Sequence, residues 1–163
     1  SQMAQINTVT GIQQLNKTME SMAGQFTAMQ VLQGTQMIGR TVLTEGNTLG
    51  VGKEKSYTAA FDLEGPAADV KVQITTASGQ LVDTVELGSG TAGRNYFTWD
   101  GSKYTGDASQ LRYTVQATNA DTVVASTTLS PHAVLATGTT DGKLTLELDD
   151  GTNVAYASVK DVY

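Results

Sequence analysis

Apolar side chains recur at helical spacing in the first part of the chain. The gaps between them are 3, 4, 3, 4 and 3 residues, which is the pattern of a helix with an apolar stripe along one side. Gln and Met, both good helix formers, are frequent here. The sequence therefore predicts an N-terminal helical segment over residues 1–36, although Gly11, Gly24 and Gly34 each weaken it by about 1 kcal/mol. The apolar stripe comprises Ile12, Leu15, Met19, Met22, Phe26 and Met29.

Two interpretations of the apolar stripe are open. The helix could pack its stripe on its own β domain or fray at the terminus, or it could bury the stripe against other copies or a partner. A helix of 36 residues would be about 54 Å long, which exceeds the width of a small β domain. We therefore favour a stripe that contacts another molecule, and a Met-rich surface suits partners that fit imprecisely or change.

Period-two alternation replaces the helical period over residues 53–130. Six short runs alternate apolar and polar positions, and Gly, Asn and Asp turn residues separate them. Strands at this spacing are typical of an immunoglobulin-like or fibronectin type III-like sandwich. The runs are Tyr57–Leu63, Val70–Thr75, Leu81–Leu87, Arg94–Trp99, Leu111–Thr118 and Val123–Leu129.

The tail, residues 131–163, predicts a separate small β unit. It begins after Pro131, a candidate boundary, and contains the hairpin signals Asp141-Gly142 and Asp150-Gly151. Its strands are too few to enclose a core alone. The unassigned strand candidate at Met37–Thr44 lies on the other side of the sandwich. We therefore expect a discontinuous small β-barrel, formed by 37–52 plus 131–163, into which the sandwich is inserted.

Composition narrows the possible functions. The 163 residues include no Cys and one His, which excludes disulfides, Cys-based zinc sites and multi-histidine metal sites. The net charge of −6 lies entirely in residues 37–163 and argues against nucleic acid. No apolar run is long enough for membrane insertion. We expect no cofactor and no metal. The chain starts at Ser1 without a secretory signal pattern, and we expect it to be a fragment of a longer protein.

No other segment of the sequence carries a strong motif for metal binding, phosphate binding or catalysis. Asp149-Asp150-Gly151 could suggest calcium but lacks the ligand spacing of an EF-hand, so a hairpin turn is favoured. The segment 88–93 lacks the Lys of a phosphate-binding loop. Ser56, Ser126 and His132 do not form a nucleophile motif. Enzymatic activity is therefore not expected.

The aromatic residues leave two binding alternatives. Most of the aromatic residues lie in the predicted sandwich, where we expect them to pack in the core. Exposed rings such as Tyr96 or Tyr104 would instead favour an extracellular carbohydrate-binding or adhesin module. A methyl-lysine cage in the small barrel is disfavoured, because those segments hold only Tyr156 and Tyr163.

Several segments together resemble the flagellar hook-capping FlgD family. The first 16 residues are similar to the family's "SQLAQ…QLN" run, with Met3 in place of Leu. Gly39-Arg40-Thr41-Val42 resembles its "G-R/K-x-V" strand, and Phe97–Gly101 resembles its Trp-Asp-Gly turn. The run Tyr113–Ala117 follows in the expected place, although Leu111-Arg112 replaces a common Gly.

This resemblance implies a mainly β fold, with an immunoglobulin/fibronectin type III-like sandwich inserted in a Tudor-like barrel and preceded by a helix. It implies a non-catalytic scaffold that is exported through the flagellar type III apparatus. Such a scaffold sits as a homo-oligomeric cap at the extracellular tip of the growing hook and promotes polymerisation of the hook protein. The apolar stripe would then serve self-association or contact with the hook.

Overall fold

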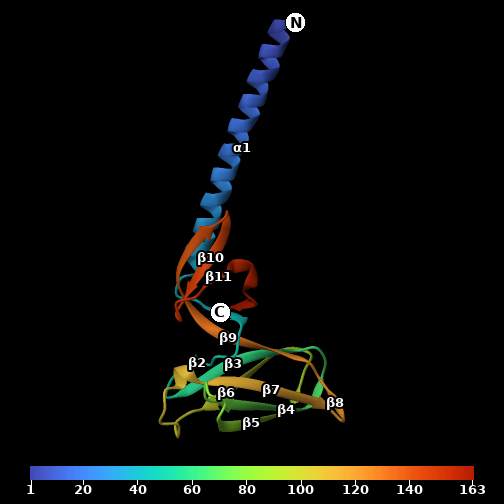
Figure 1. Cartoon of the computed structure of the whole chain (residues 1–163), viewed down its shortest axis with the longest axis vertical. Helices are drawn as coiled ribbons and strands as arrows, with labels where there is room; N and C mark the ends of the chain where they lie inside the picture. The colour runs from blue at the N-terminus through green and yellow to red at the C-terminus, as the bar shows by residue number, and fades with distance from the viewer.

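The computed structural model describes residues 1–163 and has an elongated shape (Figure 1). A single helix, α1 (Gln2–Met37), projects from a small sheet, and a β-sandwich lies at the opposite end. The N-terminus is at the far tip of α1. The prediction of a mainly β chain with an N-terminal helix and a β-sandwich is confirmed.

The end of α1 is docked on the small sheet. Only Gly34 and Met37 of the helix are buried. A Cβ on Gly34 would lie 2.8 Å from Thr137 Oγ1 and 3.0 Å from Leu144 Cδ1, so the helix approaches the sheet closely at this point. Arg40 Nε donates to the carbonyl of Gln36, which satisfies a free carbonyl at the end of the helix.

The sandwich consists of two antiparallel layers. One layer contains β2 (Gly50–Val51), β3 (Ser56–Leu63) and β6 (Gly93–Asp100), in which β3 pairs with both β2 and β6. The other has the order β5 (Leu81–Gly90), β4 (Ala67–Thr75), β7 (Arg112–Asn119) and β8 (Thr122–Val123). A short 3-10 helix, η1 (Ala108–Gln110), precedes β7. The alternating positions meet in the core: Ala59, Phe61, Leu63, Ala67, Val70, Val72, Ile74, Phe97, Trp99, Leu111, Tyr113 and Ala117.

One long strand joins the sandwich to the small sheet. β9 (Ser126–Thr140) pairs through residues 126–129 with β3, through 129–133 with β1 (Thr41–Glu45), and through 134–140 with β10 (Lys143–Leu148). The small sheet has the order β11 (Asn153–Ala155), β10, β9, β1 and β12 (Asp161–Val162). A 3-10 helix, η2 (Tyr156–Ser158), follows β11. The core of this unit is Met37, Val42, Val134, Leu146 and Leu148.

Pro131 does not separate two strands, as the sequence suggested, but lies within β9. The predicted run Val123–Leu129 therefore continues through Pro131 into the tail, and Ser126–Thr140 is one strand. Pro131 is opposite Leu43, whose carbonyl accepts a hydrogen bond from Lys160 N–H of the neighbouring chain segment. The backbone N–H and C=O of Leu43 therefore point away from β9. The Leu43–Pro131 pair needs no N–H from Pro131, so the pairing of β1 with β9 tolerates the proline.

Three other boundaries differ from the prediction. The helix continues through Met37, so the following strand starts at Thr41. Gly50–Val51 pairs with β3 and thus belongs to the sandwich layer, although the sequence assigned 37–52 to the small barrel. The segment 88–93 is mostly strand, because β5 extends to Gly90 and β6 begins at Gly93.

A buried tyrosine hydroxyl ties the two sandwich layers together. Tyr113 Oη lies 2.7 Å from the carbonyl oxygen of Ala60 and 2.6 Å from that of Leu129. It also accepts a hydrogen bond from Leu129 N–H at 3.0 Å. Burial raises the pKa of Tyr113, and the hydrogen bond to Leu129 opposes this shift only partly.

We expect Tyr113→Phe to lower the free energy of unfolding by about 1–3 kcal/mol, because it leaves buried polar groups without a partner. The difference in unfolding free energy between wild type and Tyr113→Phe should be full below about pH 10 and shrink above it. The reason is that Tyr113 ionises at a lower pH in the unfolded chain than in the folded protein. Urea unfolding from about pH 8 to about pH 11 measures both effects. Tyr156→Phe, at an exposed position, is the control and should change stability by less than about 0.5 kcal/mol. An equal loss in both variants would refute the role of Tyr113.

We expect Gly34→Ala to loosen the docking of α1, because its Cβ would collide with Thr137 and Leu144. Gly24→Ala is the matched control, since a Cβ there meets nothing within 4 Å and should stabilise the helix by up to about 1 kcal/mol. Hydrogen exchange of the amides in residues 30–37 should accelerate only in Gly34→Ala. Equal protection in the two variants would show that close packing at Gly34 does not hold the helix.

Candidate interaction surface and junction pocket

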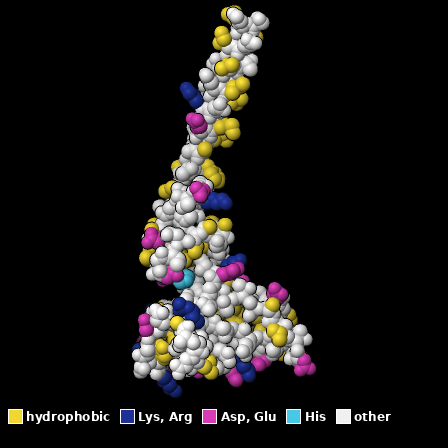
Figure 2. Space-filling model, in the orientation of Figure 1, with side chains coloured by type: hydrophobic (Ala, Val, Ile, Leu, Met, Phe, Trp, Pro, Cys, Tyr) yellow, Lys and Arg dark blue, Asp and Glu magenta, His cyan; other side chains and the backbone are white.

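The apolar stripe lies on the projecting part of α1, where no other segment of the chain covers it. Its six side chains retain between 52% (Ile12) and 69% (Met19) of their exposure. The yellow side chains in Figure 2 follow the helix from near its tip down to the small sheet. The structure thus brings all six predicted residues onto one uncovered helix and buries none of them.

The surroundings of the apolar stripe are nearly uncharged. Lys17 and Glu20 are the only charged side chains of α1, and neither forms an ion pair within 4.0 Å. The helix does not meet the criteria of length and apolarity for crossing a membrane. A long helix that exposes large apolar side chains at this spacing has the form of a helix that pairs with another helix or lies in an apolar groove.

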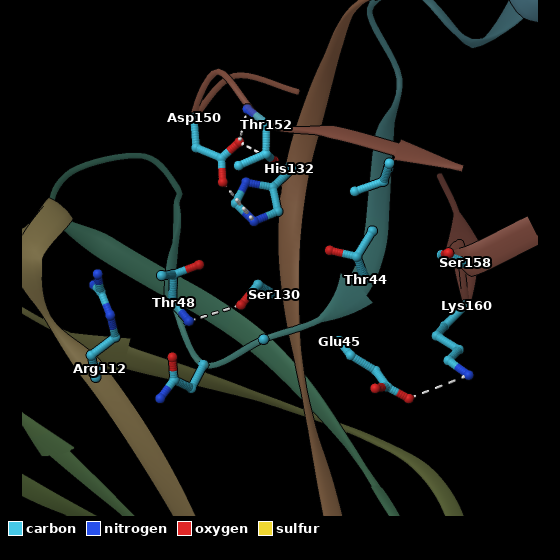
Figure 3. Close-up of a pocket in the computed structure, with 13 residues that line it drawn as sticks. Thr44, Glu45, Thr48, Arg112, Ser130, His132, Asp150, Thr152, Ser158 and Lys160 are labelled. Carbon is cyan, nitrogen blue, oxygen red and sulfur yellow. Dashed lines mark hydrogen bonds and ion pairs between the residues drawn. The ribbon is translucent and has the colours of Figure 1, made fainter. Parts of the chain in front are cut away.

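A polar cavity, the junction pocket, lies where the sandwich meets the small sheet (Figure 3). Its volume is about 690 Å³, and Val154 is the only hydrophobic residue among the 13 that line it. The lining comes from the end of β1 and the loop that follows it, the start of β7, the middle of β9, the turn between β10 and β11, and the segment from β11 through η2 to Lys160. Because several separate elements contribute, no single sequence motif could have indicated this pocket.

His132 of β9 is held between two carboxylates at the edge of the junction pocket. Its Nδ1 lies 2.9 Å from Asp149 Oδ1, and its Nε2 lies 3.8 Å from Asp150 Oδ2. Asp149 also accepts a hydrogen bond from Ala133 N–H. The sequence identified His132 only as a boundary residue, and its contacts show that it joins β9 to the turn between β10 and β11.

The Asp149-Asp150-Gly151 segment forms the turn that the sequence favoured. Asp150 Oδ1 accepts hydrogen bonds from the N–H and hydroxyl of Thr152, and Gly151 has a φ of +81°. Partial burial acts to raise the pKa of Asp150, but these hydrogen bonds together with the nearby His132 outweigh it, and the pKa is lowered. The donor atoms of His132, Asp149 and Asp150 lie within 4.8 Å of one another. Within this cluster the two imidazole nitrogens face different carboxylates.

The remaining charged side chains of the junction pocket each have a partner within the protein, an ion pair for Lys160 and backbone carbonyls for Arg112. Lys160 Nζ lies 3.5 Å from Glu45 Oε1, and Arg112 donates to the backbone carbonyls of Ser109 and Leu111. Ser130 Oγ accepts a hydrogen bond from Thr48 N–H at 2.8 Å and so fixes the loop that leaves β1. The cavity therefore serves first as a polar joint between the two β units.

The aromatic residues of the sandwich lie mainly in its core. Trp99 is buried, donates from Nε1 to Asp83 Oδ2 at 2.7 Å, and packs between Tyr57 and Tyr104. Tyr104 is thus part of this cluster. Of Tyr96 and Tyr104, the two candidates for carbohydrate binding, only Tyr96 is exposed. These positions therefore do not provide a pair of exposed rings.

A family model for the FlgD Ig-like domain matches residues 46–122, which span β2 to β8. The chain is 40% identical over 113 residues to the basal-body rod modification protein FlgD of Salmonella typhimurium, covering 65% of the chain and 49% of that protein. The chain is 41% identical over 109 residues to the Escherichia coli protein of the same name, and this match covers 63% of the chain and 47% of that protein. The protein of the same name from Buchnera aphidicola subsp. Acyrthosiphon pisum is 26% identical over 165 residues, covering 99% of the chain and 70% of that protein.

The chain spans about half the length of the Salmonella and Escherichia proteins that it matches. Among solved structures, FlgD of Xanthomonas campestris aligns with a TM-score of 0.65 and 23% identity, over 82% of this chain and 99% of that one. FlgD of Pseudomonas aeruginosa aligns with a TM-score of 0.62 and 23% identity, over 78% of this chain and 98% of that one. These two likenesses support the fold, and the sequence matches agree with them. Residues 46–122 therefore match the FlgD Ig-like domain, and 63–65% of the chain is similar in sequence to the FlgD proteins of Escherichia and Salmonella.

Proposed function

We propose that the chain is part of a non-catalytic scaffold that caps the growing flagellar hook and promotes polymerisation of hook subunits. The names of the relatives support a role in flagellar assembly, since those in Salmonella and Escherichia are called basal-body rod modification proteins. The Xanthomonas relative is described in terms of hook capping essential for flagellar assembly.

The observation that carries the proposal is the uncovered apolar stripe on α1. Complete burial of a Leu, Ile, Phe or Met side chain contributes about 1.5–3 kcal/mol. Six such side chains together are comparable with the cost of association, which is about 4–15 kcal/mol. We therefore propose that the apolar stripe mediates self-association, or contact with the hook, and that the association depends on protein concentration.

The two parts of the chain then have different roles. The nearly neutral helix provides association, while the acidic β body, with the whole net charge of −6, forms the plate of the cap and faces incoming subunits. A second copy of this chain and the flagellar hook protein are the proposed partners, and the type III export apparatus is the proposed route to the extracellular tip. The absence of Cys is compatible with passage of an unfolded chain through such a channel.

We expect the double change Leu15→Asp and Met22→Asp to abolish self-association, because it introduces two charges into the apolar stripe. Sedimentation of the 163-residue chain should show a loss of oligomer mass, while near-ultraviolet circular dichroism should show that the β units remain folded. The same changes in the whole protein should impair motility of the bacteria that carry it.

Gln13→Asp with Ser21→Asp is the matched control. The helical period places both residues on the side of α1 opposite the apolar stripe, and both are exposed. The control adds the same charge to the same helix and should leave oligomer mass and motility unchanged. If the stripe variant also leaves both unchanged, the proposed role of the stripe is wrong.

A further inference from the structure

A second surface feature, the tyrosine slot, lies where the end of the chain crosses the outer face of the sandwich. It is a cavity of about 320 Å³ between β3, β6 and β12. Its polar and aromatic lining consists of Thr58, Tyr96, Thr98, Asp161 and Tyr163, together with Ala59 and Phe97. Tyr96 and Tyr163 are 57% and 55% exposed, so their rings are open to a binding partner.

The charges around the tyrosine slot do not cancel. Arg94 forms a two-pronged ion pair with Asp62, with Nη2 and Oδ2 3.1 Å apart. Its Nη1 makes a longer contact of 3.4 Å with Asp161 Oδ2. One guanidinium thus faces two carboxylates, and the Asp161 side chain remains 44% exposed. The slot carries one unmatched negative charge at its edge.

Both tyrosines line the slot together with that carboxylate. Tyr96 Oη donates to Asp161 Oδ2 at 3.1 Å, although the two residues are 65 positions apart. The pKa of Tyr163 is raised, first by partial burial and then by the proximity of Tyr96 and Asp161. Two exposed π faces beside a carboxylate form an environment that attracts a cation and disfavours an anion.

We propose that the tyrosine slot binds an arginine side chain presented by a partner protein. Charge complementarity selects a cation, and the volume, near the lower limit of about 300 Å³ for ligand pockets, suits one side chain. A guanidinium is planar and can stack on a tyrosine ring while it donates to Asp161, whereas an ammonium has no flat face to stack. The tyrosine slot is remote in sequence from the apolar stripe. The proposal of arginine binding can therefore be tested independently of the proposed association through the stripe.

The test is a titration of the 163-residue chain with a capped Gly-Arg-Gly peptide, followed by nuclear magnetic resonance of the tyrosine rings. The ring signals of Tyr96 and Tyr163 should shift saturably, with a dissociation constant in the millimolar range. Capped Gly-Gln-Gly should produce no saturable shift, and capped Gly-Lys-Gly should bind more weakly than the arginine peptide.

Tyr96→Ala should weaken binding of the arginine peptide at least about fivefold, whereas Tyr96→Phe, which keeps the ring, should retain most of it. Tyr163→Ala provides a second loss-of-ring variant. Tyr156→Ala removes an exposed tyrosine outside the tyrosine slot and should have no effect. Unchanged binding in both Tyr96→Ala and Tyr163→Ala, tighter binding of the lysine peptide, or equal shifts with the glutamine peptide would overturn the proposal.

Discussion

The backbone hydrogen bonding of β9 is the constraint on which the rest of the structure depends. This one strand exchanges ladder bonds with β3, then β1, then β10, so the sandwich and the small sheet share a continuous backbone. Each transfer must keep the register, because a shift of one residue would turn every side chain of β9 to the opposite face. The orientation of the two units therefore follows from one ladder and not from a flexible linker.

The transfer point on β9 also creates both cavities at the junction. Residues 130–133 pair only with β1, which leaves Ser130 and His132 free to contact the β1–β2 loop and the turn at Asp149. β1 in turn positions β12, which carries Asp161 across to Tyr96 on the sandwich. Polar side chains thus fix the joint on the side of the junction pocket, and an ion-pair cluster fixes it at the tyrosine slot.

The pattern of apolar residues predicted much of the fold. Strand alternation indicated the core positions of β3, β4, β6 and β7, because residues that face the core recur every second position. The spacing of the apolar stripe indicated α1 and its uncovered side. Strand ends were less accurate, since Pro131 signals a break locally but occupies a position of β9 that needs no N–H donor. Gly50 was assigned to the wrong unit, because its pairing with Thr58 depends on a distant strand.

The sequence by itself determined the helix, the alternating strands, the turn at Asp150 and the division between a neutral arm and an acidic body. These properties depend on neighbouring residues and on composition, so they are visible without the fold. Only the tertiary structure decided that β9 is continuous, that His132 lies between two carboxylates, and that Tyr96 is hydrogen-bonded to Asp161 and lines one slot with Tyr163. The physical reason is that these contacts join residues that are distant in the chain, and strand pairing alone brings such residues within reach of one another.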